Sequence, residues 1–282
     1  MTPLLHYFIL LPLVAFLIGL IIPGSKEKHI AFSTIFFSSA HLLLLLTFMS
    51  LWVYNSFPIV DEKSLVFIKA DDIEIFLDFY FDRITCVFAL IGSILMLLVS
   101  IFSRFYLHRE QGYKRFFSMI QLFFLGYNLI IFSGNYETLF IGWEFIGIAS
   151  FLLISFYRDR YLPVRNSIKV ISIYRLGDIA LILAMWMSHH IWHENIVFAK
   201  FNDPSLLSSH LSEHYPSALF IMFMVVLAAM IKSGQFPFSS WLPRAMEGPT
   251  TSSGLFLWRI IFTYRCFPFA SYSEVLGNNA RN

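Results

Sequence analysis

The chain has 282 residues, of which 57% are hydrophobic, 18% aromatic and only 13% charged. A typical soluble domain is about one quarter charged, so this composition excludes a water-exposed globular enzyme. Twenty Lys and Arg against eighteen Asp and Glu leave a formal charge of +2, which excludes the clustered basic surface of a nucleic-acid-binding protein. The lipid bilayer is therefore the expected solvent, and no nucleic-acid partner is expected.

Seven apolar runs are long enough to span a membrane, since about 20 helical residues cross the hydrocarbon core. They lie at 5–22, 30–53, 84–103, 116–134, 137–157, 167–188 and 216–232. A weaker eighth run covers 253–270. The predicted fold class is an all-α membrane protein, a polytopic bundle of about 7–8 transmembrane helices.

The long loop at 55–83 has a different pattern. Its stretch 64–81, SLVFIKADDIEIFLDFYF, mixes β-branched and aromatic residues with acids. Such a mixture is typical of strands rather than of a membrane helix. It predicts a short extramembrane β-hairpin.

Five ionisable residues fall inside the apolar runs, where charge is expensive and points to function or to pairing. They are Glu144, Lys169, Arg175, Asp178 and Lys232. Nothing near Glu144 in the sequence neutralises it. Arg175 and Asp178 are three residues apart, so they share one helix face and can form an ion pair. Lys169 is close enough to its helix end to extend to the headgroups.

Lys232 is followed by a predicted break in the seventh helix. Gly234 and Pro237 come directly after it, and proline cannot continue the helical hydrogen-bond ladder. A carboxylate and a lysine in a low dielectric readily take up and release protons. Glu144, Lys232, Arg175 and Asp178 are therefore predicted to form a proton relay. Helix packing by buried polar groups is the alternative for each of them.

Cofactor and metal motifs are not found in the sequence. His189 and His193 are four residues apart and Glu194 follows, but this segment closes a membrane helix, so the metal interpretation is the weaker one. The sequence contains no CxxC, P-loop or strand-associated GxGxxG motif. We expect no cofactor, no metal and no redox site in this chain, with any electron chemistry in partner subunits.

The orientation prediction comes from the loops. Those after the first, third and fifth runs hold nine Lys and Arg, whereas those after the second, fourth and sixth hold four over many more residues. The positive-inside rule then places the N-terminus outside.

Five ordered motifs carry a resemblance to a known family. They are FDRIT (81–85), GYKRFF (112–117), GNYETLFIGWEFIGIASFLLISFY (134–157), YRLGD (174–178) and KSGQFPFSSWLPRAMEGPT (232–250). With them the chain resembles the antiporter-like membrane subunits of respiratory complex I, most of all the subunit L or chain 5 branch. The large subunits of Mrp antiporters and the membrane subunits of inorganic-carbon transporters are similar as well.

The resemblance implies a mechanism. In the family, the glutamate matched by Glu144 pairs with the lysine matched by Lys232, while Arg175 and Asp178 match residues of the same polar path. It implies a non-catalytic, proton-translocating subunit of an NADH–quinone oxidoreductase-like complex. Proton movement would be coupled to electron transfer in other subunits, which would carry flavin, iron–sulfur clusters and quinone. Glu144 would face a neighbouring membrane subunit.

The resemblance also implies an organisation and leaves alternatives. Residues 1–54 would form transmembrane helices 1–2, 55–83 the hairpin loop, 84–250 an antiporter-like proton-translocation half-domain, and 251–282 an atypical C-terminal segment. Family members have a second, inverted half, so the chain is expected to be truncated. The alternatives are a membrane subunit of an Mrp-type cation/proton antiporter or inorganic-carbon transporter, or a truncated non-pumping fragment. The expected location is a bacterial or mitochondrial inner membrane.

Overall fold

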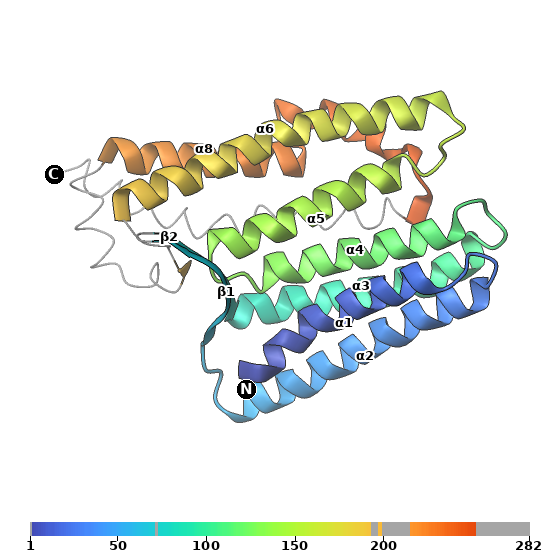
Figure 1. Cartoon of the computed structure of the whole chain (residues 1–282), viewed down its shortest axis with the longest axis horizontal. Helices are drawn as coiled ribbons and strands as arrows, with labels where there is room; N and C mark the ends of the chain where they lie inside the picture. Colours follow the sequence, from blue (N-terminus) through green and yellow to red (C-terminus); the bar gives the residue numbers. More distant parts are fainter. Residues whose placement is uncertain (1, 71–72, 193–196, 199–214, 252–282) are drawn as a thin grey trace.

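The computed structural model describes residues 2–70, 73–192, 197–198 and 215–251. Within these ranges, seven α-helices run roughly side by side, with a two-stranded sheet at one end (Figure 1). The helices are α1 (Thr2–Ile21), α2 (Glu27–Tyr54), α3 (Arg83–Tyr106), α4 (Tyr113–Ile131), α5 (Tyr136–Ile154), α6 (Tyr161–Trp192) and α8 (Tyr215–Ser233). The predicted helical bundle is thus confirmed as a class. The eighth run predicted at 253–270 lies outside the described residues.

Six of the seven described helices are long and apolar enough to cross a membrane, and α4 is the exception. Its sequence contains Lys114, Arg115, Gln121 and Asn128, which lower its mean hydropathy. Lys114 and Arg115 lie in its first turn, at the end of the helix, whereas Gln121 and Asn128 are buried. Packing shelters these two amides, since 15 of the 19 residues of α4 are buried by the other elements. Helix α4 packs against α1 and α5 and also contacts α2 and α3, so it forms the centre of the bundle.

Two glycines let the central helices approach closely. A Cβ atom on Gly126 of α4 would lie 2.8 Å from the carbonyl oxygen of Gly142 on α5, and a Cβ atom on Gly142 would lie 2.7 Å from the carbonyl oxygen of Gly126. Small residues at helix contacts are typical of membrane bundles, where van der Waals packing replaces the hydrophobic driving force. This contact fixes α5 against the core and, with it, one wall of the candidate site.

The connections gather at two ends of the bundle (Figure 1). We call one the basic end: it holds the α1–α2, α3–α4 and α5–α6 connections, in which the sequence has most of its loop Lys and Arg. The other is the hairpin end, with the sheet and the short α4–α5 connection. The structure therefore groups the loops as the alternation of predicted helices requires.

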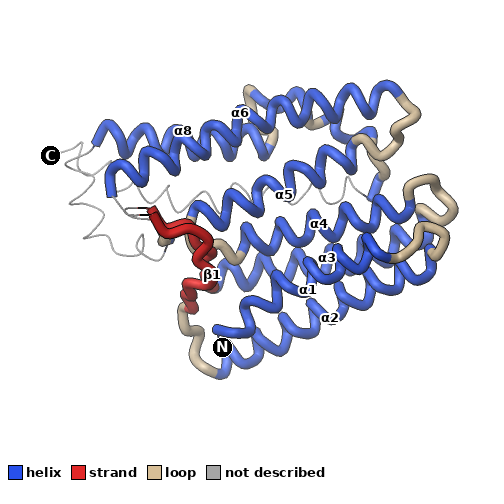
Figure 2. The backbone as a smooth tube through the Cα atoms, viewed as in Figure 1, coloured by secondary structure: helices blue, strands red, loops and turns tan. Residues whose placement is uncertain are grey.

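The predicted hairpin is present at the hairpin end (Figure 2). Strand β1 (Val60–Ala70) pairs antiparallel with β2 (Ile73–Phe81), starting four residues earlier than the predicted stretch, and Lys63 stands opposite Asp78. The sheet is anchored to the α4–α5 connection, because the Tyr80 N–H donates to the Phe132 carbonyl at 2.8 Å and the Gly134 N–H to the Asp78 carbonyl at 2.7 Å. These bonds satisfy backbone groups that a free edge would leave exposed.

Candidate functional site

The four predicted relay residues lie on three adjacent helices. Glu144 comes from α5, Arg175 and Asp178 from α6, and Lys232 from the last turn of α8. Helix α6 packs against both α5 and α8, so these residues, far apart in the sequence, reach one region. Lys169, nearer the start of α6, lies away from them and borders a separate cavity with Trp241 and Arg244.

Lys232 is buried, with 2% of its surface exposed. Its Nζ donates a hydrogen bond to the Trp143 carbonyl at 3.1 Å. The same nitrogen lies over the ring of Trp143, 4.7 Å from the centroid, and over the ring of Tyr174, 4.6 Å from the centroid. Two aromatic faces and a carbonyl oxygen stabilise a cation in a site from which water is excluded.

Gly147 makes room for the lysine head group. A Cβ atom at this position would lie 3.1 Å from Lys232 Nζ, closer than most such contacts allow. Gly147 is one turn beyond Trp143 on α5, on the same face. The backbone of α5 therefore shapes the space that the ammonium group occupies.

Asp178 is linked to Lys232 through Trp143. Its carboxylate is buried and accepts a hydrogen bond from Trp143 Nε1 at 2.7 Å. Trp143 thus donates to the aspartate with its ring and accepts from the lysine with its carbonyl oxygen. Asp178 and Lys232 are therefore connected through a single residue, Trp143.

Arg175 joins the two carboxylates. Its Nη1 lies 3.0 Å from Glu144 Oε1 and 3.2 Å from Asp178 Oδ2. The ion pair that the sequence predicted between Arg175 and Asp178 is therefore confirmed. Glu144 proves to be neutralised by a residue 31 positions away, which no local pattern could reveal.

The direct pairing of Glu144 with Lys232, implied by the resemblance, differs in this structure. Among the described residues, the ion pairs within 4.0 Å include Glu144 with Arg175 but not Glu144 with Lys232. Glu144 is paired with Arg175, and Lys232 donates a hydrogen bond to the Trp143 carbonyl. The series Glu144, Arg175, Asp178, Trp143 and Lys232 is nonetheless continuous.

This series reaches the surface of the bundle at one end only. The Lys232 and Asp178 side chains are buried, whereas 22% of Glu144 and 48% of Arg175 are exposed. An exposed ion pair within a membrane-spanning segment is unfavourable against lipid chains, so this face requires water or protein beside it.

The helix break follows Lys232 as predicted. Helix α8 ends at Ser233, and Gly234 adopts a φ of +68°, in the left-handed region that favours glycine. Two short 3₁₀ helices follow at Phe238–Trp241 and Pro243–Glu247, with Pro237 immediately before the first. The chain thus leaves the helix beside the lysine, and carbonyl groups of its last turn lose their helical partners.

Trp241 is a site residue that the sequence analysis missed. It is buried, its Nε1 donates to the Ile231 carbonyl at 3.2 Å, and its ring meets Tyr174 edge to face at 4.9 Å. Trp143, Tyr174 and Trp241 all lie inside the quoted motifs, beside the charged residues. Aromatic residues next to an intramembrane charge were the available signal.

A second polar cluster lies at the hairpin end. Asp78 of β2 is 1% exposed, and its Oδ2 has no hydrogen-bond partner. Burial first, then repulsion from the carboxylates of Asp61 and Glu137, raises the pKa of Asp78 to about 7, while Lys63 opposes the rise. Glu137, in the first turn of α5, also contacts His189 Nε2 of α6 at 3.0 Å.

The metal interpretation of the histidine segment gains no support here. His189 contacts Glu137, whereas His193 and Glu194 lie outside the described residues. Among the residues that are described, no group of three His, Cys, Asp or Glu side chains could hold a metal ion.

Comparisons with known protein families show which family this chain belongs to. The profile of the NADH:quinone oxidoreductase/Mrp antiporter transmembrane region matches residues 133–277, about half of the sequence. The chain belongs to this family. A second profile, the N-terminal region of complex I chain 5, matches residues 67–117. The family match covers all four relay candidates and extends into the segment at 251–282. The chain is thus an integral, multi-pass membrane protein.

Individual relatives agree with the profiles. Over 259 residues, the chain is 29% identical to NADH-quinone oxidoreductase subunit L of Buchnera aphidicola, covering 89% of this chain and 40% of the relative. It is 33% identical to NADH-ubiquinone oxidoreductase chain 5 of Metridium senile over 225 residues, covering 78% of this chain and 36% of the relative. The chain therefore spans less than half the length of these curated relatives.

A solved structure shares the fold. The Mrp complex from Dietzia sp. DQ12-45-1b matches with a TM-score of 0.73 and 22% identity, over 93% of this chain and 27% of the matched one. At this identity the likeness concerns the fold alone.

Proposed function

We propose that this chain is a proton-translocating membrane subunit of an NADH–quinone oxidoreductase-like complex. The observation that carries the proposal is Lys232, a lysine buried between two aromatic rings at a helix end and linked through Trp143 to a charged series. The names of the relatives support the complex, because they are subunits and chains of NADH-quinone and NADH-ubiquinone oxidoreductases. Partner membrane subunits would then cover the remaining surface.

The mechanism follows from the shared arginine. Arg175 Nη1 contacts both Glu144 and Asp178, so neutralising Glu144 leaves the arginine with Asp178 alone. When Arg175 pairs with Asp178 alone, it offsets more of the negative charge of that carboxylate. Asp178 then attracts the Lys232 ammonium group less, which favours release of a proton from Lys232 Nζ. Restoring the charge on Glu144 reverses the change and favours reprotonation. The exposed Glu144 and Arg175 face suits contact with a neighbouring subunit, whose charge would then control the lysine.

The direct test uses the complete assembly in sealed vesicles. Lys232→Ala should abolish proton uptake coupled to NADH oxidation, and Glu144→Gln should alter its pH profile. Lys169→Ala is the matched control, because this lysine lies outside the charged series, and it should pump normally. Unchanged pumping by an assembled Lys232→Ala complex would overturn the proposed relay.

A second candidate function is supported by the solved structure. The fold matches the Mrp complex over 93% of this chain, so a membrane subunit of a cation/proton antiporter is the alternative. The isolated assembly distinguishes the two: NADH-dependent quinone reduction indicates the first, and sodium/proton exchange without redox activity indicates the second.

The proposed orientation places the basic end on the inner side of the membrane. This follows from its excess of Lys and Arg, and it leaves the N-terminus and the hairpin outside. A reporter inserted at Gly112, in the α3–α4 connection, should give an internal signal, and an external signal would reverse the orientation.

A further inference from the structure

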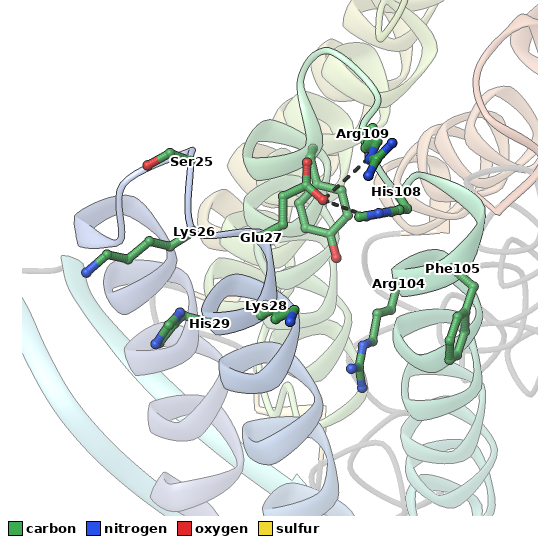
Figure 3. Close-up of a pocket in the computed structure, with 10 residues that line it drawn as sticks. Ser25, Lys26, Glu27, Lys28, His29, Arg104, Phe105, His108 and Arg109 are labelled. Atoms are coloured by element: carbon green, nitrogen blue, oxygen red, sulfur yellow. Dashed lines mark hydrogen bonds and ion pairs between the residues drawn. The ribbon is translucent and has the colours of Figure 1, made fainter.

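A pocket at the basic end lies apart from the charged series described above. Its volume is about 740 Å³, and it lies between the α1–α2 connection, the start of α2 and the end of α3 (Figure 3). Lys28 projects from α2 and Arg104 from α3, and the pocket opens between these two neighbouring helices. Nothing in the proposed proton path uses these residues.

Positive charge dominates the lining of the pocket. Four side chains with fixed positive charge, Lys26, Lys28, Arg104 and Arg109, surround a single carboxylate, Glu27. That carboxylate is already engaged, since its Oε2 accepts from His108 Nδ1 at 2.8 Å and from the Arg109 N–H at 3.4 Å. Figure 3 shows both contacts crossing from α2 to the α3–α4 connection. Glu27 therefore holds the two connections together, and an excess of positive charge is left for a ligand.

Backbone features strengthen this preference for an anion. Helix α2 begins at Glu27 and α4 at Tyr113, both at the pocket, and the residue before each helix provides no side-chain cap. The positive ends of these helix dipoles therefore face the same region. Arg109 adopts a φ of +65°, a conformation that favours glycine. The side chain of Arg109 lines the pocket in this conformation.

An apolar surface continues from the pocket along the two helices. Phe32 and Phe36 follow the basic residues on α2 and are 71% and 55% exposed, and Phe102 and Phe105 on α3 are 56% and 72% exposed. In a membrane helix such residues face the acyl chains. Charged groups at the end of the bundle with phenylalanines directly beneath them match the two parts of a lipid molecule.

We propose that this pocket binds the phosphodiester head group of an anionic phospholipid, with the acyl chains against the exposed phenylalanines of α2 and α3. Basic pockets between membrane helices are suited to such head groups. A free phosphate ion shares the head-group chemistry but makes no use of the apolar surface. The lipid is therefore the occupant that accounts for both features.

The test measures lipid binding to the purified full chain in a neutral detergent, and it requires no proton transport. The probes are phosphatidylglycerol, phosphatidylcholine and inorganic phosphate, with affinities from native mass spectrometry or thermophoresis. Arg104→Gln with Arg109→Gln should weaken phosphatidylglycerol binding roughly 30-fold, at about 1 kcal/mol for each basic residue. Phosphatidylcholine binding should not change.

A matched control separates this site from general electrostatic attraction. Arg158→Gln with Arg160→Gln removes two charges from the α5–α6 connection at the same end, and phosphatidylglycerol binding should remain within about threefold of wild type. If the first double variant does not fold, as judged by its helical circular dichroism, Lys26→Gln with Lys28→Gln replaces it, because both lysines are exposed.

Three results would overturn the proposal. Equal affinity for phosphatidylglycerol and phosphatidylcholine would remove the role of charge. Equal losses in the pocket variant and in the control variant would show non-specific attraction. Full displacement of the lipid by inorganic phosphate at comparable concentration would assign the pocket to the free anion.

Discussion

Ionisation of Asp78 should control how firmly the hairpin is attached to the bundle. The Asp78 N–H donates to Thr138 Oγ1 at 2.9 Å and its carbonyl accepts from Gly134, so this residue joins β2 to the start of α5. Its buried carboxyl group lies close to Gly134, where a Cβ atom would come within 2.6 Å of Oδ2. No room is left for hydration of a carboxylate, so the neutral acid fits better than the anion.

The size of the effect follows from the pKa. In the folded state the pKa of Asp78 is raised from 3.8 to about 7, so the folded state binds a proton that the unfolded state releases between these values. The stabilisation from this group is complete below pH 4 and is lost as the pH rises towards 7. The slope approaches 1.4 kcal/mol for each pH unit, and the total is about 4 kcal/mol.

Hydrogen exchange of the hairpin amides provides the assay. After correction for the intrinsic rate, protection of β2 in the purified protein should fall almost tenfold for each pH unit between pH 5 and pH 7. Asp78→Asn cannot ionise and should show little pH dependence, with better protection than wild type at pH 8. Asp61→Asn removes a nearby negative charge and should lower the pKa of Asp78, so the loss of protection should end at a lower pH and be smaller in total.

A matched control is available at the start of α3. Asp82 caps this helix by accepting from the Thr85 N–H, and asparagine caps helices equally well, so Asp82→Asn should retain the wild-type slope. A wild-type slope in Asp78→Asn would refute the reasoning, because the titrating group would then be another residue.

Two further substitutions test the packing around the relay. Gly142→Ala should destabilise the protein by about 1–3 kcal/mol, because its Cβ atom would lie 2.7 Å from the Gly126 carbonyl oxygen at the α4–α5 contact. Thermal unfolding would measure the loss. Gly19→Ala is the control, because the nearest atom to its Cβ would be at an ordinary 3.5 Å. Gly147→Ala should displace the Lys232 ammonium group by a few tenths of an ångström. Coupled proton uptake by the intact assembly should then fall several-fold. Normal uptake would show that the position of the lysine is not critical.

Local patterns predicted the elements of this fold well. Apolar runs of spanning length became helices, because a segment without charges can satisfy its backbone in a membrane only as a helix. The β-branched and aromatic stretch became the hairpin, and the helix ended after Lys232, where Gly234 takes a left-handed conformation. Helix α4 departed from the simple pattern, since its polar residues Gln121 and Asn128 are buried against the neighbouring helices.

Pairing within the site was predicted only where it was local. Arg175 and Asp178 are three residues apart on one helix, and their contact followed from helix geometry. The contact of Arg175 with Glu144 spans 31 residues, and that of Lys232 with Trp143 spans 89. Both depend on how α5, α6 and α8 pack, which no single segment determines.

The sequence by itself determined that this is a membrane protein, which ionisable residues fall inside its apolar runs, and that the helix breaks after Lys232. Those properties depend on residue type over short distances, through transfer to lipid and backbone hydrogen bonding. Only the tertiary structure decided that Arg175 stands between the two carboxylates, that Trp143 connects Asp178 to Lys232, and that the basic residues of two connections enclose one pocket. Each of these depends on contacts between helices, whose partners are selected by packing over the whole bundle.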